Sequence, residues 1–250
     1  MSLKSHIMQK PNSTEFYVGY LDRMPSGLAQ FYKRNLIVLC VFIVVLVSIF
    51  AYLQSKFDRG RFDFYTPTEY IGFLRTFPLP HIQTEMGETY LLVGDGKFGA
   101  FEWAETNSNQ WVRFSAKLIE RKPLKMLEVE RNTLPQLVDI KTKSESVVKS
   151  YGQMTLTGEL VDSKCYLGVM RPATGKVHRA CAIRCLSGGV PPGILLRHAD
   201  IDLSVMILLS GPDGKLDFDK EWAGKNVSAS GEFVFENGLP ILKTSKIILL

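Results

Sequence analysis

The 250-residue sequence has little of what marks most enzymes and nucleic-acid-binding proteins. It shows no glycine-rich phosphate loop, no serine–histidine–aspartate set and no paired-carboxylate pattern. Its formal net charge is only +5, and lysine and arginine nowhere cluster among aromatic residues, so nucleic acid is not expected as a partner. Cysteine and histidine are scarce, with four residues of each. The composition favours a protein that acts by binding over an enzyme.

One stretch, from Asn35 through Ser55, lacks charge altogether. As a helix it is long enough to cross a hydrocarbon core of ~30 Å, and no small-x-small cleavage pattern follows it. Residues 35–55 are therefore predicted to form one uncleaved transmembrane helix, after an irregular basic tail at residues 1–34. The two flanks of this helix carry equal numbers of nearby basic residues, so the positive-inside rule does not decide its orientation in the membrane.

The orientation follows from the arrangement of the chain. A short basic tail before a long domain is typical of a signal anchor, so we expect a cytoplasmic tail and a periplasmic C-terminal domain. This predicts a single-pass protein of the bacterial inner membrane, with the membrane and a membrane protein complex as its partners.

Beyond the helix, short β-type runs alternate with turn signals, and one pattern occurs twice. Residues 111–129 align without a gap on residues 226–244, apolar on apolar at most positions. Short strands interrupted by one long excursion in each copy are similar to the OB-fold, a five-stranded Greek-key barrel. The sequence thus predicts a mainly β protein with two tandem OB-like modules. These are residues 59–140 and 151–250, joined by a polar linker at residues 141–150.

The second module carries a cysteine–histidine motif with the spacing C-x12-H-x2-C-x3-C: Cys165, His178, Cys181 and Cys185. Val177–Leu186 is predicted as a short helix within a long loop, ended by Gly188-Gly189, because glycine reaches left-handed backbone angles freely. The imidazole and the two later thiols share one stripe of that helix. Cys165 would close over them from the preceding strand. Three sulfurs and one imidazole form a soft tetrahedral ligand set, suited to zinc or copper(I).

Other interpretations of these residues remain open. In an oxidising compartment Cys165 can form a disulfide with Cys181 or Cys185, which would fasten the loop and leave one thiol spare. Alternatively, the three cysteines are buried small hydrophobic residues and His178 lies at the surface. Asp162 is a candidate to orient His178 by a hydrogen bond from outside the ligand set, or else it is a turn-forming aspartate.

Two resemblances accompany the motif. A C-x3-C pair with a nearby histidine is similar to the copper sites of cytochrome oxidase and of the copper-delivering proteins that assemble it. The rest of the chain does not resemble the thioredoxin and cupredoxin folds that carry those sites. The segments V-D-S-K-C-Y and G-K-V-H-R-A-C-A-x-R-C-x-S-G-G-V-P-P resemble an uncharacterised module of bacterial membrane-anchored or exported proteins. That second resemblance covers about residues 152–250 and implies the module without an activity.

Three functions are compatible with these features. We favour a membrane-anchored accessory or assembly protein, whose barrels act by binding. The main alternative is a zinc- or copper-binding protein of the cell envelope that handles metal or electrons. A hydrolase or transferase with Cys165 or Cys185 as nucleophile ranks last, because no histidine–carboxylate pair is expected to activate either thiol.

Overall fold

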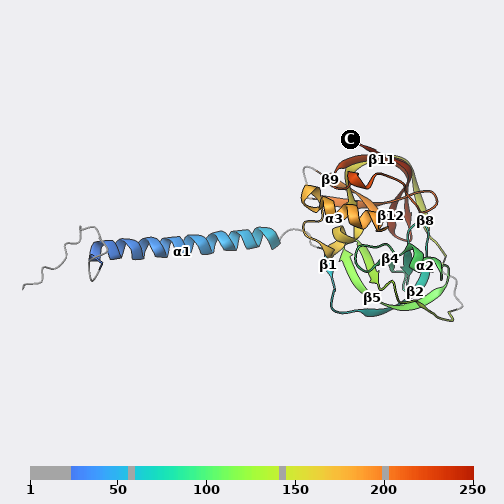
Figure 1. The fold of residues 1–250 in the computed structure, drawn as a ribbon, viewed down its shortest axis with the longest axis horizontal. Helices are drawn as coiled ribbons and strands as arrows, with labels where there is room; N and C mark the ends of the chain where they lie inside the picture. Colours follow the sequence, from blue (N-terminus) through green and yellow to red (C-terminus); the bar gives the residue numbers. More distant parts are fainter. Residues whose placement is uncertain (1–23, 56–59, 141–144, 199–202) are drawn as a thin grey trace, which may run out of the picture. The chain divides into compact units, whose positions relative to one another are not determined.

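The computed structural model describes residues 24–55, 60–140, 145–198 and 203–250, and Figure 1 shows their fold. The chain divides into two compact units, Met1–Asp58 and Arg59–Leu250. The second unit is built mainly from strands. This agrees with the prediction of a mainly β protein that follows one N-terminal apolar helix.

The first unit contributes the helix α1 (Ser26–Ser55). Its most apolar 18-residue window has a mean hydropathy of 3.2. The helix is therefore long and apolar enough to cross a membrane, as an anchor or a signal sequence. It begins at Ser26 and not at Asn35, which corrects the predicted boundary: Lys33 and Arg34 are good helix formers and continue the helix beyond the apolar stretch. The rest of the predicted tail, residues 1–23, lies outside the described part of the chain.

The first barrel is a closed ring of five strands. Its elements are β1 (Arg61–Phe62), β2 (Thr68–Arg75), β3 (His81–Gln83), β4 (Thr89–Gly94), α2 (Phe101–Glu105), β5 (Trp111–Arg121), β6 (Leu124–Val129) and β7 (Gln136–Leu137). β2 pairs antiparallel with β5 and β3, and β3 pairs antiparallel with β4. β4 runs parallel to β6, which closes the ring against β5. The short strands β1 and β7 add to β5 outside this ring.

The second barrel repeats this pairing scheme. Its elements are β8 (Val148–Asp162), the single-turn helix η1 (Cys165–Val169), α3 (Gly175–Ser187), β9 (Pro192–His198), β10 (Leu203–Ser210), η2 (Lys220–Trp222), β11 (Asn226–Glu236) and β12 (Leu239–Leu249). β8 pairs antiparallel with β11 and β9, and β9 with β10. β10 runs parallel to β12, which closes the ring against β11. η1 and α3 lie in the connection between the first two strands of this ring.

Both rings are therefore five-stranded barrels of the OB type. The corresponding strands β5 and β11 begin at Trp111 and Asn226, and β6 and β12 begin at Leu124 and Leu239. The starts of the corresponding strands are therefore separated by the same number of residues as the two sequence segments that align, residues 111–129 and 226–244. β8 takes in the last three residues of the predicted linker, because it begins at Val148. Residues 141–144 of that linker are not among the described residues.

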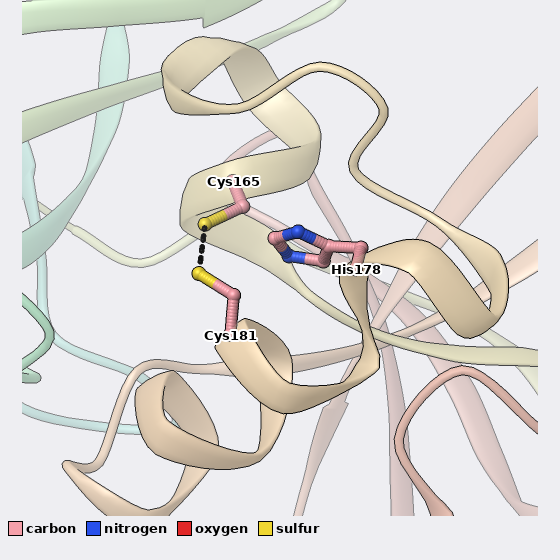
Figure 2. A group of neighbouring side chains, drawn as sticks. All are labelled: Cys165, His178 and Cys181. Carbon is pink, nitrogen blue, oxygen red and sulfur yellow. Dashed lines mark hydrogen bonds between the residues drawn. The ribbon is translucent and has the colours of Figure 1, made fainter.

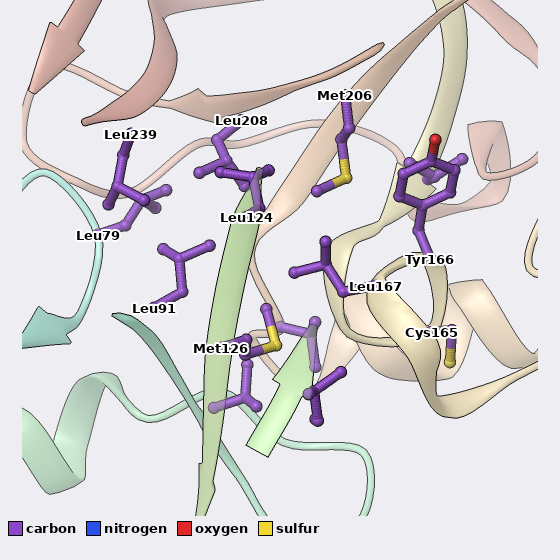
Figure 3. Close-up of a cluster of buried hydrophobic side chains, with 14 of the residues drawn as sticks. Leu79, Leu91, Leu124, Met126, Cys165, Tyr166, Leu167, Met206, Leu208 and Leu239 are labelled. Atoms are coloured by element: carbon purple, nitrogen blue, oxygen red, sulfur yellow. The ribbon is translucent and has the colours of Figure 1, made fainter. Parts of the chain in front are cut away.

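A shared apolar core joins the two barrels. It contains Leu91 and Met126 from the first barrel and Leu208 and Leu239 from the second, all buried together (Figure 3). Full burial of such a side chain contributes roughly 1.5–3 kcal/mol. Cys165 belongs to the same core. The segment that carries the first predicted ligand is thus held in the seam between the barrels.

Polar contacts also cross this seam. The ring of His81, which is fully buried, hydrogen-bonds through Nδ1 to the carbonyl oxygen of Leu79 at 2.7 Å and through Nε2 to Nδ2 of Asn237 at 3.1 Å. A carbonyl accepts and an amide NH2 donates, so these partners fit a neutral ring with its hydrogen on Nδ1. Desolvation by burial lowers the pKa of His81, which keeps the ring in this neutral form.

Candidate functional site

The predicted ligands are carried by the connection between β8 and β9. Asp162 ends β8, Cys165 begins η1, and α3 follows. α3 ends as the sequence predicts. The N–H of Gly188 donates to the carbonyl oxygens of Arg184 and Cys185 at 3.0 and 3.1 Å, and Gly189 has a φ of 87°. These are the features of a glycine stop, which satisfies the last carbonyl groups of a helix.

Three thiols meet at this point. Sγ of Cys165 lies 3.9 Å from Sγ of Cys181 and 3.9 Å from Sγ of Cys185. A disulfide requires a sulfur–sulfur distance of about 2.05 Å, and all three residues are free cysteines in the structure. Figure 2 shows Cys165 and Cys181 facing each other with the ring of His178 beside them. The predicted approach of Cys165 to the helix-borne thiols is therefore present, although Cys165 lies in η1 and not on the preceding strand, which ends at Asp162.

His178 turns inward and not to solvent. Its side chain is 2% exposed, and Nε2 lies 2.9 Å from Oδ2 of Asp162, a fully buried carboxylate. Oδ1 of the same carboxylate accepts the backbone N–H of Cys165 at 2.8 Å. Because a carboxylate accepts, Nε2 carries the hydrogen in the neutral ring and Nδ1 keeps its lone pair. Nδ1 is buried and makes no hydrogen bond to any described residue.

The candidate ligand atoms fall into two overlapping groups. One holds Cys165, His178 and Cys181, and the other holds Asp162, Cys165 and Cys185, with all atoms of each group within 4.8 Å of one another. Cys165 belongs to both. The four predicted ligands are thus assembled around Cys165, and they do not form one group in which every pair is that close. Asp162 is hydrogen-bonded to Nε2 of His178 and stays a candidate to orient it.

Acidity is divided unevenly between two of the thiols. The hydrogen bond with Cys185, together with burial and the charge of Asp162, raises the pKa of Cys165. The same hydrogen bond lowers the pKa of Cys185. Without a metal ion the proton therefore stays on Cys165, and Cys185 is the more readily ionised sulfur.

A lysine of the first barrel completes the site, and no sequence pattern pointed to it. Nζ of Lys97 donates to Sγ of Cys181 at 2.7 Å, and this hydrogen bond raises the pKa of Lys97. Lys97 lies in the turn after β4, where the glycines and aspartate around it predict only a turn. Its position beside the cysteines depends on how the two barrels pack.

That turn is fixed to the second barrel at two points. Nζ of Lys164, 1% exposed, donates to the carbonyl oxygens of Gly94 and Gly96 at 2.8 and 2.7 Å and lies 2.5 Å from Oε2 of Glu128. The N–H of Gly99 donates to the carbonyl oxygen of Gly188 at 2.8 Å. A Cβ atom at Gly188 would lie 1.9 Å from the carbonyl oxygen of Lys97. Glycine is therefore required for this close approach of the two backbones.

The arrangement bears on the possibility of a catalytic thiol. Asp162 and His178 form a histidine–carboxylate pair beside Cys165, whereas no such pair was expected to be placed to activate a thiol. However, Cys165 is buried with a raised pKa, and Cys185, whose pKa is lowered, is buried as well. A nucleophilic cysteine requires a thiolate that a substrate can reach. The geometry therefore fits metal ligation better than nucleophilic catalysis.

No family model matches the chain, and no curated protein or solved structure matches it.

Proposed function

We propose that the protein is a membrane-anchored accessory protein in which Cys165, His178, Cys181 and Cys185 hold one zinc or copper(I) ion. One observation carries the proposal. The buried imidazole of His178 is oriented by Asp162 through Nε2, while Nδ1 makes no hydrogen bond to a described residue and the ring lies beside two free thiols. Metal-binding histidines characteristically donate their second ring N–H to a carboxylate in this way.

The sulfur positions support the same conclusion. In a tetrahedral site with metal–sulfur bonds of about 2.3 Å, two sulfurs lie about 3.8 Å apart. The two distances from Cys165 are 3.9 Å each. Neither a disulfide nor a purely apolar role of the cysteines gives Nδ1 of His178 a partner, and a buried polar atom without a partner costs about 1–3 kcal/mol. A metal ion at this position removes that cost.

The accessory role rests on the rest of the molecule. Two OB-type barrels present loops and faces to partners, and α1 supplies an anchor. We place α1 in a bacterial inner membrane and the barrels in the periplasm, where they bind a membrane protein complex. In an oxidising compartment a bound metal protects closely spaced thiols from forming a disulfide. A reporter that is active only in the periplasm, fused after Leu250, tests this orientation: an inactive reporter contradicts it.

Elemental analysis of the purified full-length protein in detergent tests the metal site. We expect about one zinc or copper ion per chain and, after denaturation with a chelator, four reactive thiols, since the chain has four cysteines. His178→Ala and Cys165→Ser are expected to lose the metal. Cys40→Ser is the matched control, because Cys40 lies in α1, and it is expected to keep the metal.

Two results would decide against the metal site. Protein without metal in which only two thiols react would identify a disulfide within the cluster. Protein without metal in which all four thiols react would leave the cysteines as buried apolar residues. In both cases the accessory role would remain, without a metal centre.

A further inference from the structure

The candidate metal centre has one side that differs from the others. Asp162, Cys165, His178 and Cys185 are buried, whereas Cys181 is half-buried. Lys97, whose side chain is exposed, places its ammonium group 2.7 Å from Sγ of Cys181. A positive charge from the first barrel thus covers the solvent-facing ligand of a set that otherwise belongs to the second barrel.

The position of this charge is set by the fold. The turn that carries Lys97 is held by the buried Nζ of Lys164, which binds two of its carbonyl oxygens. The charge of Lys164 is itself balanced by Glu128 at 2.5 Å. Lys97 is a cation next to the sulfur ligands, and among the described residues its side chain bonds to Cys181 and not to a carboxylate.

The two candidate ions would give the centre different charges. Three thiolates and a neutral imidazole bring Zn²⁺ to a net charge of −1 and Cu⁺ to −2. The negative charge of the Asp162 carboxylate repels both complexes, and it destabilises the more negative copper complex more strongly than the zinc complex. The ammonium group of Lys97 attracts both, and it attracts the more negative one more strongly.

We propose that Lys97 is a specificity-determining residue that shifts the metal preference of this centre toward the ion of lower charge, copper(I) over zinc(II). This inference rests on the proposed metal site. With a nitrogen–sulfur distance of 2.7 Å and a metal–sulfur bond of about 2.3 Å, the ammonium group lies within about 5 Å of the ion. At that distance one unit of charge difference changes the ratio of the two affinities by roughly tenfold or more.

The test measures the affinities of the full-length protein for Cu⁺ and Zn²⁺ by competition with chelators of known affinity, without oxygen. Lys97→Met removes the charge and keeps most of the length of the side chain. We expect it to lower the copper-to-zinc affinity ratio by roughly tenfold or more. Lys97→Arg keeps the charge, so its copper-to-zinc affinity ratio is expected to stay close to that of the wild type. Lys246→Met, at an exposed position of β12, is the control for a general change in charge and is expected to leave the ratio unchanged.

Two outcomes would overturn the inference. An unchanged ratio in Lys97→Met would show that the charge does not discriminate between the ions. An equal loss of affinity for both ions would show that Lys97 only supports the structure of the site. A wild-type protein that binds neither ion would instead refute the metal site itself, and the inference with it, so the two failures are distinguishable.

Discussion

Replacing Lys164 with methionine is expected to weaken the junction between the two barrels. The side chain of Lys164 is 1% exposed, and Nζ lies 2.5 Å from Oε2 of Glu128, which is 8% exposed. Nζ also donates to the carbonyl oxygens of Gly94 and Gly96. Methionine fills a similar volume but leaves a buried carboxylate and two carbonyl groups without this donor.

The magnitude follows from the neighbours of Glu128. Removing one partner of a buried ion pair costs about 3–5 kcal/mol of the free energy of unfolding. Nζ of Lys117 lies 3.7 Å from Oε1 of Glu128 and continues to balance part of the charge. We therefore expect a loss near the lower end, roughly 3 kcal/mol. At about 2–4 °C per kcal/mol for a protein of this size, Tm falls by roughly 6–12 °C.

Tryptophan fluorescence during thermal unfolding of the full-length protein in detergent measures this loss. Trp103, Trp111 and Trp222 all lie in the barrels, so the signal reports on the barrels and not on α1. The double variant Lys164→Met/Glu128→Gln should be more stable than Lys164→Met alone, because no unpaired charge stays buried. A Tm of Lys164→Met within about 2 °C of the wild type, or a double variant less stable than the single one, would refute the reasoning.

Two further predictions concern the seam between the barrels. Gly188→Ala places a Cβ atom 1.9 Å from the carbonyl oxygen of Lys97, so it should lower Tm and weaken metal binding together. Gly87→Ala, at a φ of 81° with open space around it, should cost only about 1–2 kcal/mol, the strain of an L-residue in the left-handed region, and leave metal binding intact. Equal effects of the two variants on metal binding would contradict this. Burial lowers the pKa of His81 below its unfolded value, so the stability it contributes is complete above about pH 6.5 and decreases as the pH falls below that value. In His81→Gln the denaturant midpoint of unfolding should fall less between about pH 6.5 and 5 than it does in the wild type. An equal fall in the two proteins would show that other groups cause the pH dependence of stability.

Much of the fold could be predicted because its signals are local. The uncharged run in α1 and the alternation of Val112, Phe114 and Ala116 with exposed residues in β5 follow from the period of each element. The stop of α3 at Gly188 follows from the conformational freedom of glycine. The start of α1 was predicted too late, because hydropathy marks where a helix enters an apolar environment and not where its hydrogen bonding begins.

The candidate site was predicted in part for the same reason. The spacing of His178, Cys181 and Cys185 within one short helix places them on one stripe, whatever surrounds that helix. The hydrogen bond from His178 to Asp162 could be suggested, because both residues lie in the same connection between strands. That the pair would be buried beside an equally buried Cys165 depends on the shared core and could not be inferred from spacing.

The sequence by itself determined a helix apolar enough for a membrane, two five-stranded barrels and a group of soft ligands on one short connection. The tertiary structure alone decided that Lys97 covers Cys181 and that Lys164 holds the turn that carries it. Each of these contacts joins residues from different barrels. Periodicity and spacing describe neighbours along the chain, whereas these contacts depend on the packing of two separate rings against a common core, which no local pattern encodes.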